Sequence, residues 1–121
     1  MHIAIVSTWG PTDTTRATLP FLHAKAAREQ GDSVTLMLMH DAVLLAHQDL
    51  AQDIVPFGPP ALGPIFEDLA ADPEVTILVC KPCVTVRRIP ENALHKDTAL
   101  ASVGDYHRAI RENNAVVANY G

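Results

Sequence analysis

The sequence predicts a single α/β domain over residues 1–121, with a five-stranded parallel sheet covered by helices on both faces. Short apolar runs without charged residues recur along the chain, which is typical of strands buried on both sides of a sheet. Segments with apolar residues at helical spacing separate these runs, and 121 residues suit one domain with a single core. The predicted strands are residues 3–7, 34–39, 75–79, 99–103 and 115–118.

The connection between the first two strands is predicted to form a helix over residues 14–30. Thr12 or Asp13 can cap this helix through a side-chain oxygen, and Gly31 is suited to end it. Pro20 lies inside the segment. Because proline lacks an N–H group and clashes with the preceding turn, we expect a kink or a late helix start near Pro20.

Further helical segments follow the second, third and fourth strands. Asp41 is expected to cap a helix over residues 42–46, and longer helices are expected over residues 61–71 and 105–113. Residues 80–88 are expected to form a loop that leads into a short helix. Strands that alternate with helices build a three-layer sandwich, and we expect a flavodoxin-like strand order with a switch point near the ends of the first and third strands.

The composition excludes several classes of function. Hydrophobic residues make up 48% of the chain and charged residues 19%, as in globular proteins. The net charge of −5 argues against a nucleic-acid partner, because such binding needs a basic patch. No apolar run approaches the roughly 20 residues of a membrane span, and no secretory signal is recognisable. We therefore expect a cytoplasmic protein with reduced thiols and no membrane association.

The strongest candidate for chemistry is the Cys-Lys-Pro-Cys sequence at residues 80–83, which holds both cysteines and directly follows the strand at 75–79. In α/β proteins, functional residues gather at the carboxyl ends of strands. A cysteine in the first turn of a helix has its thiolate stabilised by unpaired N–H groups. Lys81, Arg87 and Arg88 add positive charge and are expected to lower the thiol pKa further.

Three other interpretations of the two cysteines remain open. Both can simply pack in the core, since free cysteine is among the most buried residue types. A zinc site would need a second ligand pair, and the six histidines show no such spacing. In a thioredoxin-type dithiol the two cysteines follow a first strand rather than lying two-thirds along the chain. The sequence also lacks a phosphate-binding glycine motif, so we predict neither a metal nor an organic cofactor.

Two further residues end strands at the same predicted edge of the sheet. His40 follows the second strand and could relay protons or orient a ligand. The simpler interpretation is that Asp41 caps the next helix while His40 faces solvent or a neighbouring subunit. Thr8 follows the first strand and could line a pocket there. We therefore take His40, Thr8, Lys81 and Arg87 as candidate substrate-binding residues.

Three segments of the chain together match a known pattern. Residues 7–31 form a loop and a helix, residues 33–46 form a strand with the following Asp-Ala-Val-Leu-Leu helix, and residues 79–83, with the Arg-Arg-Ile at 87–89, form a cysteine loop. In these three segments the chain resembles the first loop and helix, the second strand and helix, and the cysteine loop of the DsrE/DsrF-like proteins of the DsrEFH superfamily. The similarity covers nearly the whole chain.

The resemblance implies a small α/β domain that assembles into homo-oligomers, either trimers or hexamers. It also implies a role in intracellular sulfur trafficking, in which a cysteine carries a persulfide between donor and acceptor proteins. Cys80 and Cys83 match the family's cysteine motif. Many members have Arg-Gly-Ile after the cysteines, whereas this chain has Arg-Ile-Pro at residues 88–90, and the missing glycine predicts a stiffer loop.

Two hypotheses for the function follow. In the first, the protein is a sulfur-relay protein similar to a sulfurtransferase: Cys80, nearest the strand end, carries the persulfide, Cys83 resolves or assists it, and Lys81 or Arg87 steadies the anionic sulfur. In the second, the protein is a non-catalytic oligomeric binding or scaffold module of the same fold, and both cysteines are structural.

Overall fold

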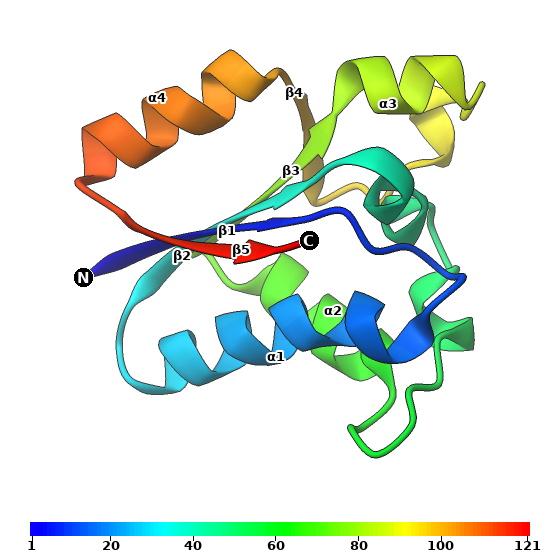
Figure 1. Ribbon diagram of the computed structural model, residues 1–121, viewed down its shortest axis with the longest axis horizontal. Helices are drawn as coiled ribbons and strands as arrows, with labels where there is room; N and C mark the ends of the chain where they lie inside the picture. Colours follow the sequence, from blue (N-terminus) through cyan, green and yellow to red (C-terminus); the bar gives the residue numbers. More distant parts are fainter.

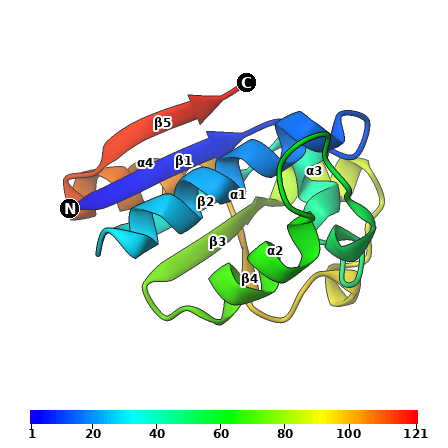
Figure 2. The same ribbon diagram turned by 90° about the horizontal axis from the view of Figure 1, so that it is seen from below.

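Five parallel strands form one sheet with the order β4-β3-β2-β1-β5. The computed structural model describes residues 1–121, and its strands agree closely with the predicted ones. Figures 1 and 2 show β1 inside the sheet, between β2 and β5. The strands are β1 (His2–Ser7), β2 (Ser33–Leu38), β3 (Val75–Cys80), β4 (Thr98–Ala101) and β5 (Val116–Tyr120).

The predicted architecture is confirmed, but the predicted strand order is wrong. β2 lies between β1 and β3, so the switch point expected at the ends of β1 and β3 does not exist. A flavodoxin-like order would have placed β2 at an edge of the sheet. Five of the six β2 residues are buried, whereas β4 and β5 have only one buried residue between them. Burial of β2 on both faces requires a neighbour on each side, and the two exposed strands form the edges.

Helices cover both faces of the sheet, as predicted. Figure 1 shows α1 and α2 on one face and α4 on the other, with α3 beside α4 at the carboxyl end of β3. The helices are α1 (Thr14–Glu29), α2 (Leu62–Ala71), α3 (Lys81–Val86) and α4 (Val103–Asn113). Three short 3-10 segments complete the chain, namely η1 (His40–Ala46), η2 (Ala51–Asp53) and η3 (Glu91–Ala93). None of the helices is long and apolar enough to cross a membrane.

The first helix begins earlier than Pro20. Asp13 caps it by accepting a hydrogen bond from the N–H of Arg16 at 3.0 Å, and the helix starts at the next residue. Pro20 is buried inside the uninterrupted helix. Its missing N–H leaves the carbonyl of Arg16 without its usual partner in the helix, but the helix continues to Glu29. Gly31 follows the helix with φ of 89°, as expected for a residue that ends it.

The densest part of the core lies between the sheet and the two helices α1 and α2. Phe21 of α1 and Phe66 of α2 are both fully buried, and their ring centroids lie 5.4 Å apart. They belong to one apolar cluster with sheet residues such as Ile5, Leu36 and Ile77, which pair in register across β1, β2 and β3. This packing fixes the three central strands, and therefore the loops at their carboxyl ends.

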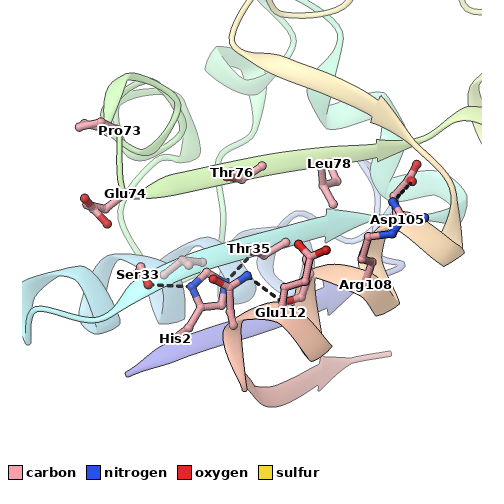
Figure 3. A pocket seen from close by; sticks show the side chains of 13 residues that line it. His2, Ser33, Thr35, Pro73, Glu74, Thr76, Leu78, Asp105, Arg108 and Glu112 are labelled. Carbon is pink, nitrogen blue, oxygen red and sulfur yellow. Dashed lines mark hydrogen bonds and ion pairs between the residues drawn. The ribbon is translucent and has the colours of Figure 1, made fainter.

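The other face of the sheet is polar at the amino ends of the strands. Figure 3 shows a hollow there, about 370 Å³ in volume, between the sheet and α4. The His2 ring bonds the hydroxyl groups of Ser33 and Thr35 at 2.7 Å each, which links β1 to β2. Across the hollow, Arg108 donates to Asp105 at 3.1 Å. These polar groups satisfy one another, and the hollow lies at the end of the sheet opposite the cysteines.

His2 gives the fold a pH dependence. Burial, together with the nearby N-terminal ammonium, lowers the pKa of His2 from the usual 6.5. The unfolded chain then binds the proton more readily than the folded chain. The contribution of His2 to the free energy of unfolding is therefore fully present above pH 6.5 and is lost as the pH drops through that value toward the lower folded pKa. We expect His2→Gln to remove this component from the free energy of unfolding, measured by urea titration between about pH 7.5 and 5. The exposed His107, changed to Gln, is the matched control and should keep the wild-type pH dependence. An unaltered dependence in His2→Gln would contradict the assignment.

Candidate functional site

Three loops meet where β1, β2 and β3 end. These strands are neighbours in the sheet and run in the same direction, with Ser7, Leu38 and Val79 paired in register. The loop after β3 carries both cysteines, and the loop after β2 carries His40 and Asp41. The predicted grouping of residues at this edge of the sheet therefore forms, although not with every predicted member.

The two cysteines have different surroundings. Cys80 ends β3 and is only 3% exposed within the apolar core. Helix α3 begins directly after it, without the predicted loop. Cys83 lies in this helix and is half-buried. Its Sγ accepts a hydrogen bond from the backbone N–H of His40, with a sulfur–nitrogen distance of 3.2 Å. Only Cys83 therefore combines partial access to solvent with a hydrogen-bond donor from the neighbouring loop.

The acidity of Cys80 differs from the prediction. Burial raises the pKa of the Cys80 thiol, and its hydrogen bond to the Cys83 side chain raises it further. The Cys83 N–H and the positive charge of Arg87 act in the opposite direction but are outweighed. The expected lowering of the pKa is therefore wrong for Cys80, because loss of hydration of the thiolate exceeds the effect of the nearby donors and charges.

Arg87 connects the two loops. It lies one helical turn after Cys83, and its guanidinium donates to the carbonyl oxygen of Cys83 at 3.2 Å. The same group donates to Asp41 Oδ1 through Nε at 3.1 Å and through Nη2 at 2.9 Å. Nη2 also lies 3.0 Å from His40 Nδ1. A single planar cation therefore contacts the helix of Cys83 and both His40 and Asp41 in the loop after β2.

The contact with Arg87 determines which nitrogen of His40 carries the proton. A guanidinium group donates hydrogen bonds and cannot accept them, so His40 Nδ1 is the acceptor and the proton of the neutral ring resides on Nε2. The backbone of His40 has φ of 52°, in the left-handed region that costs a non-glycine residue roughly 1–2 kcal/mol. The residue that donates to Cys83 is therefore held in a strained conformation by its neighbours.

We expected Asp41 to cap the helix that follows it, but it does not. The 3-10 segment η1 begins without any side-chain cap, and the carboxylate of Asp41 faces Arg87 instead. Sequence reasoning therefore missed Asp41 as a member of the site. One signal for it was available: Arg87 is four residues after Cys83, so both lie on one face of a helix and point toward a common partner.

Gly10, in the loop after β1, was also missed. A Cβ atom at this position would lie 2.7 Å from Cβ of Asp41 and 2.8 Å from its carbonyl carbon. No side chain fits in that space, so the loop after β1 packs directly on the backbone of Asp41. Asp41 is thus held from two sides, by Gly10 and by Arg87.

Two predicted binding residues lie apart from the cysteine cluster. The Thr8 hydroxyl donates to the carbonyl oxygen of Gly121 at 3.0 Å, which turns it toward the β5 side of the sheet. Lys81 lines a groove with Leu100 and Asp105, between α3 and α4. Neither side chain is hydrogen-bonded to Cys83, His40 or Arg87. Of the four predicted binding residues, the structure brings only His40 and Arg87 to the cysteines.

The loop after α3 contains a residue in the left-handed region. Arg88 has φ of 56°, a conformation that glycine adopts without strain. The chain therefore holds an arginine in a turn that favours glycine. No three side chains of His, Cys, Asp or Glu anywhere in the chain are close enough to bind a metal ion.

The fold and this edge of the sheet define a small α/β protein with a cysteine site. The sequence profile of the DsrE/DsrF-like family matches residues 1–118, and the chain belongs to that family. A comparison with curated protein sequences gives no match.

Solved structures share the fold over almost the whole chain. The YchN protein from E. coli is similar with a TM-score of 0.78 and 24% identity, covering 99% of both chains. MTH1491 from Methanobacterium thermoautotrophicum has a TM-score of 0.70 and 11% identity, covering 98% of this chain and 96% of its own. BT1422 from Bacteroides thetaiotaomicron has a TM-score of 0.61 and 14% identity, covering 98% and 93% respectively.

The close approach of Gly10 to Asp41 can be tested by adding one carbon atom. Gly10→Ala should lower the free energy of unfolding by about 1–3 kcal/mol, because the new methyl group overlaps backbone that cannot move freely. Gly104→Ala is the control: outside the adjacent helix backbone, the nearest atom to its Cβ would be Ser102 Oγ at an ordinary 3.5 Å. Urea denaturation of the two variants compares them directly. Equal stability would show that the loops are not packed as described.

The two cysteines should differ in reactivity. At about pH 7.5 we expect iodoacetamide to modify Cys83 roughly ten times faster than Cys80 or more, because Cys80 is buried and its pKa is raised. The rates are measured separately by intact-mass analysis of Cys80→Ser and Cys83→Ser, each of which retains one thiol. Equal rates in the folded proteins would contradict the difference in burial, and the difference should disappear in denaturant.

Proposed function

We propose that the protein relays sulfane sulfur, carrying it as a cysteine persulfide on the Cys80/Cys83 loop between a donor and an acceptor. Membership of the DsrE/DsrF-like family supports a sulfur-relay role. The observation that carries the proposal is the hydrogen bond from the His40 N–H to Cys83 Sγ, beside the Arg87 guanidinium. A thiol that is partly accessible, bonded to an N–H group and close to a cation is suited to nucleophilic sulfur chemistry.

The relay consists of two displacement steps that need no outside oxidant or reductant. A thiolate of the loop attacks the terminal sulfur of a donor persulfide, forming a new S–S bond. The donor's S–S bond breaks, and its electron pair leaves with the donor thiolate. An acceptor thiolate then attacks the same terminal sulfur, takes it as its own persulfide and restores the thiolate of the loop. Protons exchange with water at the exposed edge.

The hydrogen-bond donors beside Cys83 are the His40 N–H and the Arg87 guanidinium. Backbone N–H groups and guanidinium groups form stronger hydrogen bonds with anions than with neutral groups. Arg87 supplies the positive charge, and Asp41 fixes its position while neutralising part of its charge. We further propose, on the family resemblance, that the protein works in the cytoplasm as a homo-oligomer, a trimer or a hexamer, with separate donor and acceptor proteins.

One observation favours a second candidate function. Cys80 packs in the apolar core with a raised pKa, as a purely structural cysteine would. If Cys83 were equally unreactive, the protein would be a non-catalytic oligomeric binding or scaffold module of this fold. The two candidates differ in whether the folded protein accepts sulfur.

Transfer of one sulfur atom is visible as a mass change. We expect the wild-type protein to gain about 32 Da when it is incubated with glutathione persulfide, and to lose this mass when a reducing thiol is added. The control is the variant that carries both Cys80→Ser and Cys83→Ser, which should show no gain while keeping the wild-type circular dichroism spectrum. A wild-type protein that stays at its original mass would favour the scaffold function.

A further inference from the structure

We propose that Cys83, rather than Cys80, carries the sulfur, at an anion site formed by the His40 N–H and Arg87, and that Cys80 is a buried thiol that leaves the cargo intact. This inference rests on the proposed relay function and assigns different tasks to its two cysteines. It differs from the expectation that Cys80, as the residue nearest the strand end, is the carrier.

Access to the donor separates the two sulfurs. An attacking sulfur must reach the terminal sulfur of the donor from the side opposite the bond that breaks, so it needs open space in front of it. Cys80 is 3% exposed and belongs to the apolar core. Cys83 lies on the first turn of α3, half-buried, beside a His40 side chain that is itself largely exposed. A partner protein can therefore reach Cys83 without opening the core.

Contacts with the neighbouring loop single out the same sulfur. The N–H of His40 points at Cys83 Sγ, and the strained backbone of His40 is held in place by Arg87 and Asp41. A donor fixed in advance stabilises charge that forms on the sulfur without any rearrangement. The Arg87 guanidinium bonds the carbonyl oxygen of Cys83 itself, so the cation stays close to this turn of the helix.

The surroundings of Cys80 suit a protective task. If Cys80 attacked Cys83 Sγ in the persulfide, a Cys80–Cys83 disulfide would form and hydrosulfide would leave with the electron pair of the broken S–S bond. The cargo would be lost, and a reductant would be needed to restore the loop. Only a thiolate attacks in this way, and burial together with the contact to Cys83 keeps Cys80 protonated by raising its pKa. Cys80 thus lies next to the carrier cysteine without displacing the sulfur that it carries.

Separate single variants test the assignment. Each protein is incubated with glutathione persulfide and followed by intact mass. Cys80→Ser should take up the sulfur as fully as the wild type, whereas Cys83→Ser should show less than about one-tenth of the wild-type uptake. Because a serine hydroxyl in the core can disturb folding, Cys80→Ala serves as a second variant, and urea denaturation confirms that all of them are folded.

The possible outcomes distinguish this assignment from the relay function itself. Uptake by Cys83→Ser but not by either Cys80 variant would overturn the assignment and leave the relay function standing. Equal uptake by both single variants, or loss of uptake in both, would also overturn it. Absence of uptake in the wild type would refute the relay function, and the assignment with it.

A charge variant tests the anion site. Arg87→Gln should slow the uptake by roughly tenfold, because an anionic sulfur at Cys83 loses its nearby cation, whereas Arg87→Lys, which keeps the positive charge, should restore most of the wild-type rate. Arg111→Gln, which removes an exposed arginine from the last turn of α4, is the matched control and should leave the rate unchanged. Equal rates in Arg87→Gln and Arg87→Lys would indicate that Arg87 serves the fold alone and would overturn its place in the anion site.

Discussion

The contact between Arg87 and Asp41 is the interaction on which the cysteine edge depends. It joins the helix after β3 to the loop after β2, two segments that are also linked by the hydrogen bond from the His40 N–H to Cys83 Sγ. The side chains are 21% and 38% exposed, and ion pairs of this kind contribute only about 0–1 kcal/mol to stability. The importance of the contact is therefore geometric. It positions His40, whose backbone and ring both point toward α3, the helix that contains Cys83.

Much of the fold follows from the sequence because the strands are distinct apolar runs. The strand order did not follow from the sequence, because an apolar pattern alone does not state which strands are neighbours. The almost complete burial of β2 does indicate a central position for that strand. Asp41 shows a similar limit for local rules. Its position before a short helix is typical of a cap, yet a guanidinium 46 residues away in the chain provides a stronger partner for the carboxylate.

The site was predictable in its location but not in its internal arrangement. Position after a buried strand placed the cysteines at the functional edge, and closeness in the chain identified Arg87 as a positive charge near them. A helix start and nearby basic residues favour a lower thiol pKa, and burial favours a higher one. Which of the two prevails at Cys80 depends on the packing of the whole core, which neighbouring residues do not reveal. Thr8 and Lys81 illustrate the same limit, since proximity in the sheet or in the chain does not fix the direction of a side chain.

The place of β5 beside β1 also constrains how the protein folds. β1 pairs with β2 through a nearby connection, but Ile3 pairs with Val116 only across 113 positions of the chain. Tyr120 adds a bond from its hydroxyl group to the His23 ring of α1, at 2.9 Å. Pairings between distant segments form late, because closing a long loop costs entropy before the contact is made. During synthesis, one side of β1 therefore stays unpaired until the last strand arrives, and this open edge is where the nascent chain is most exposed to pairing with another molecule.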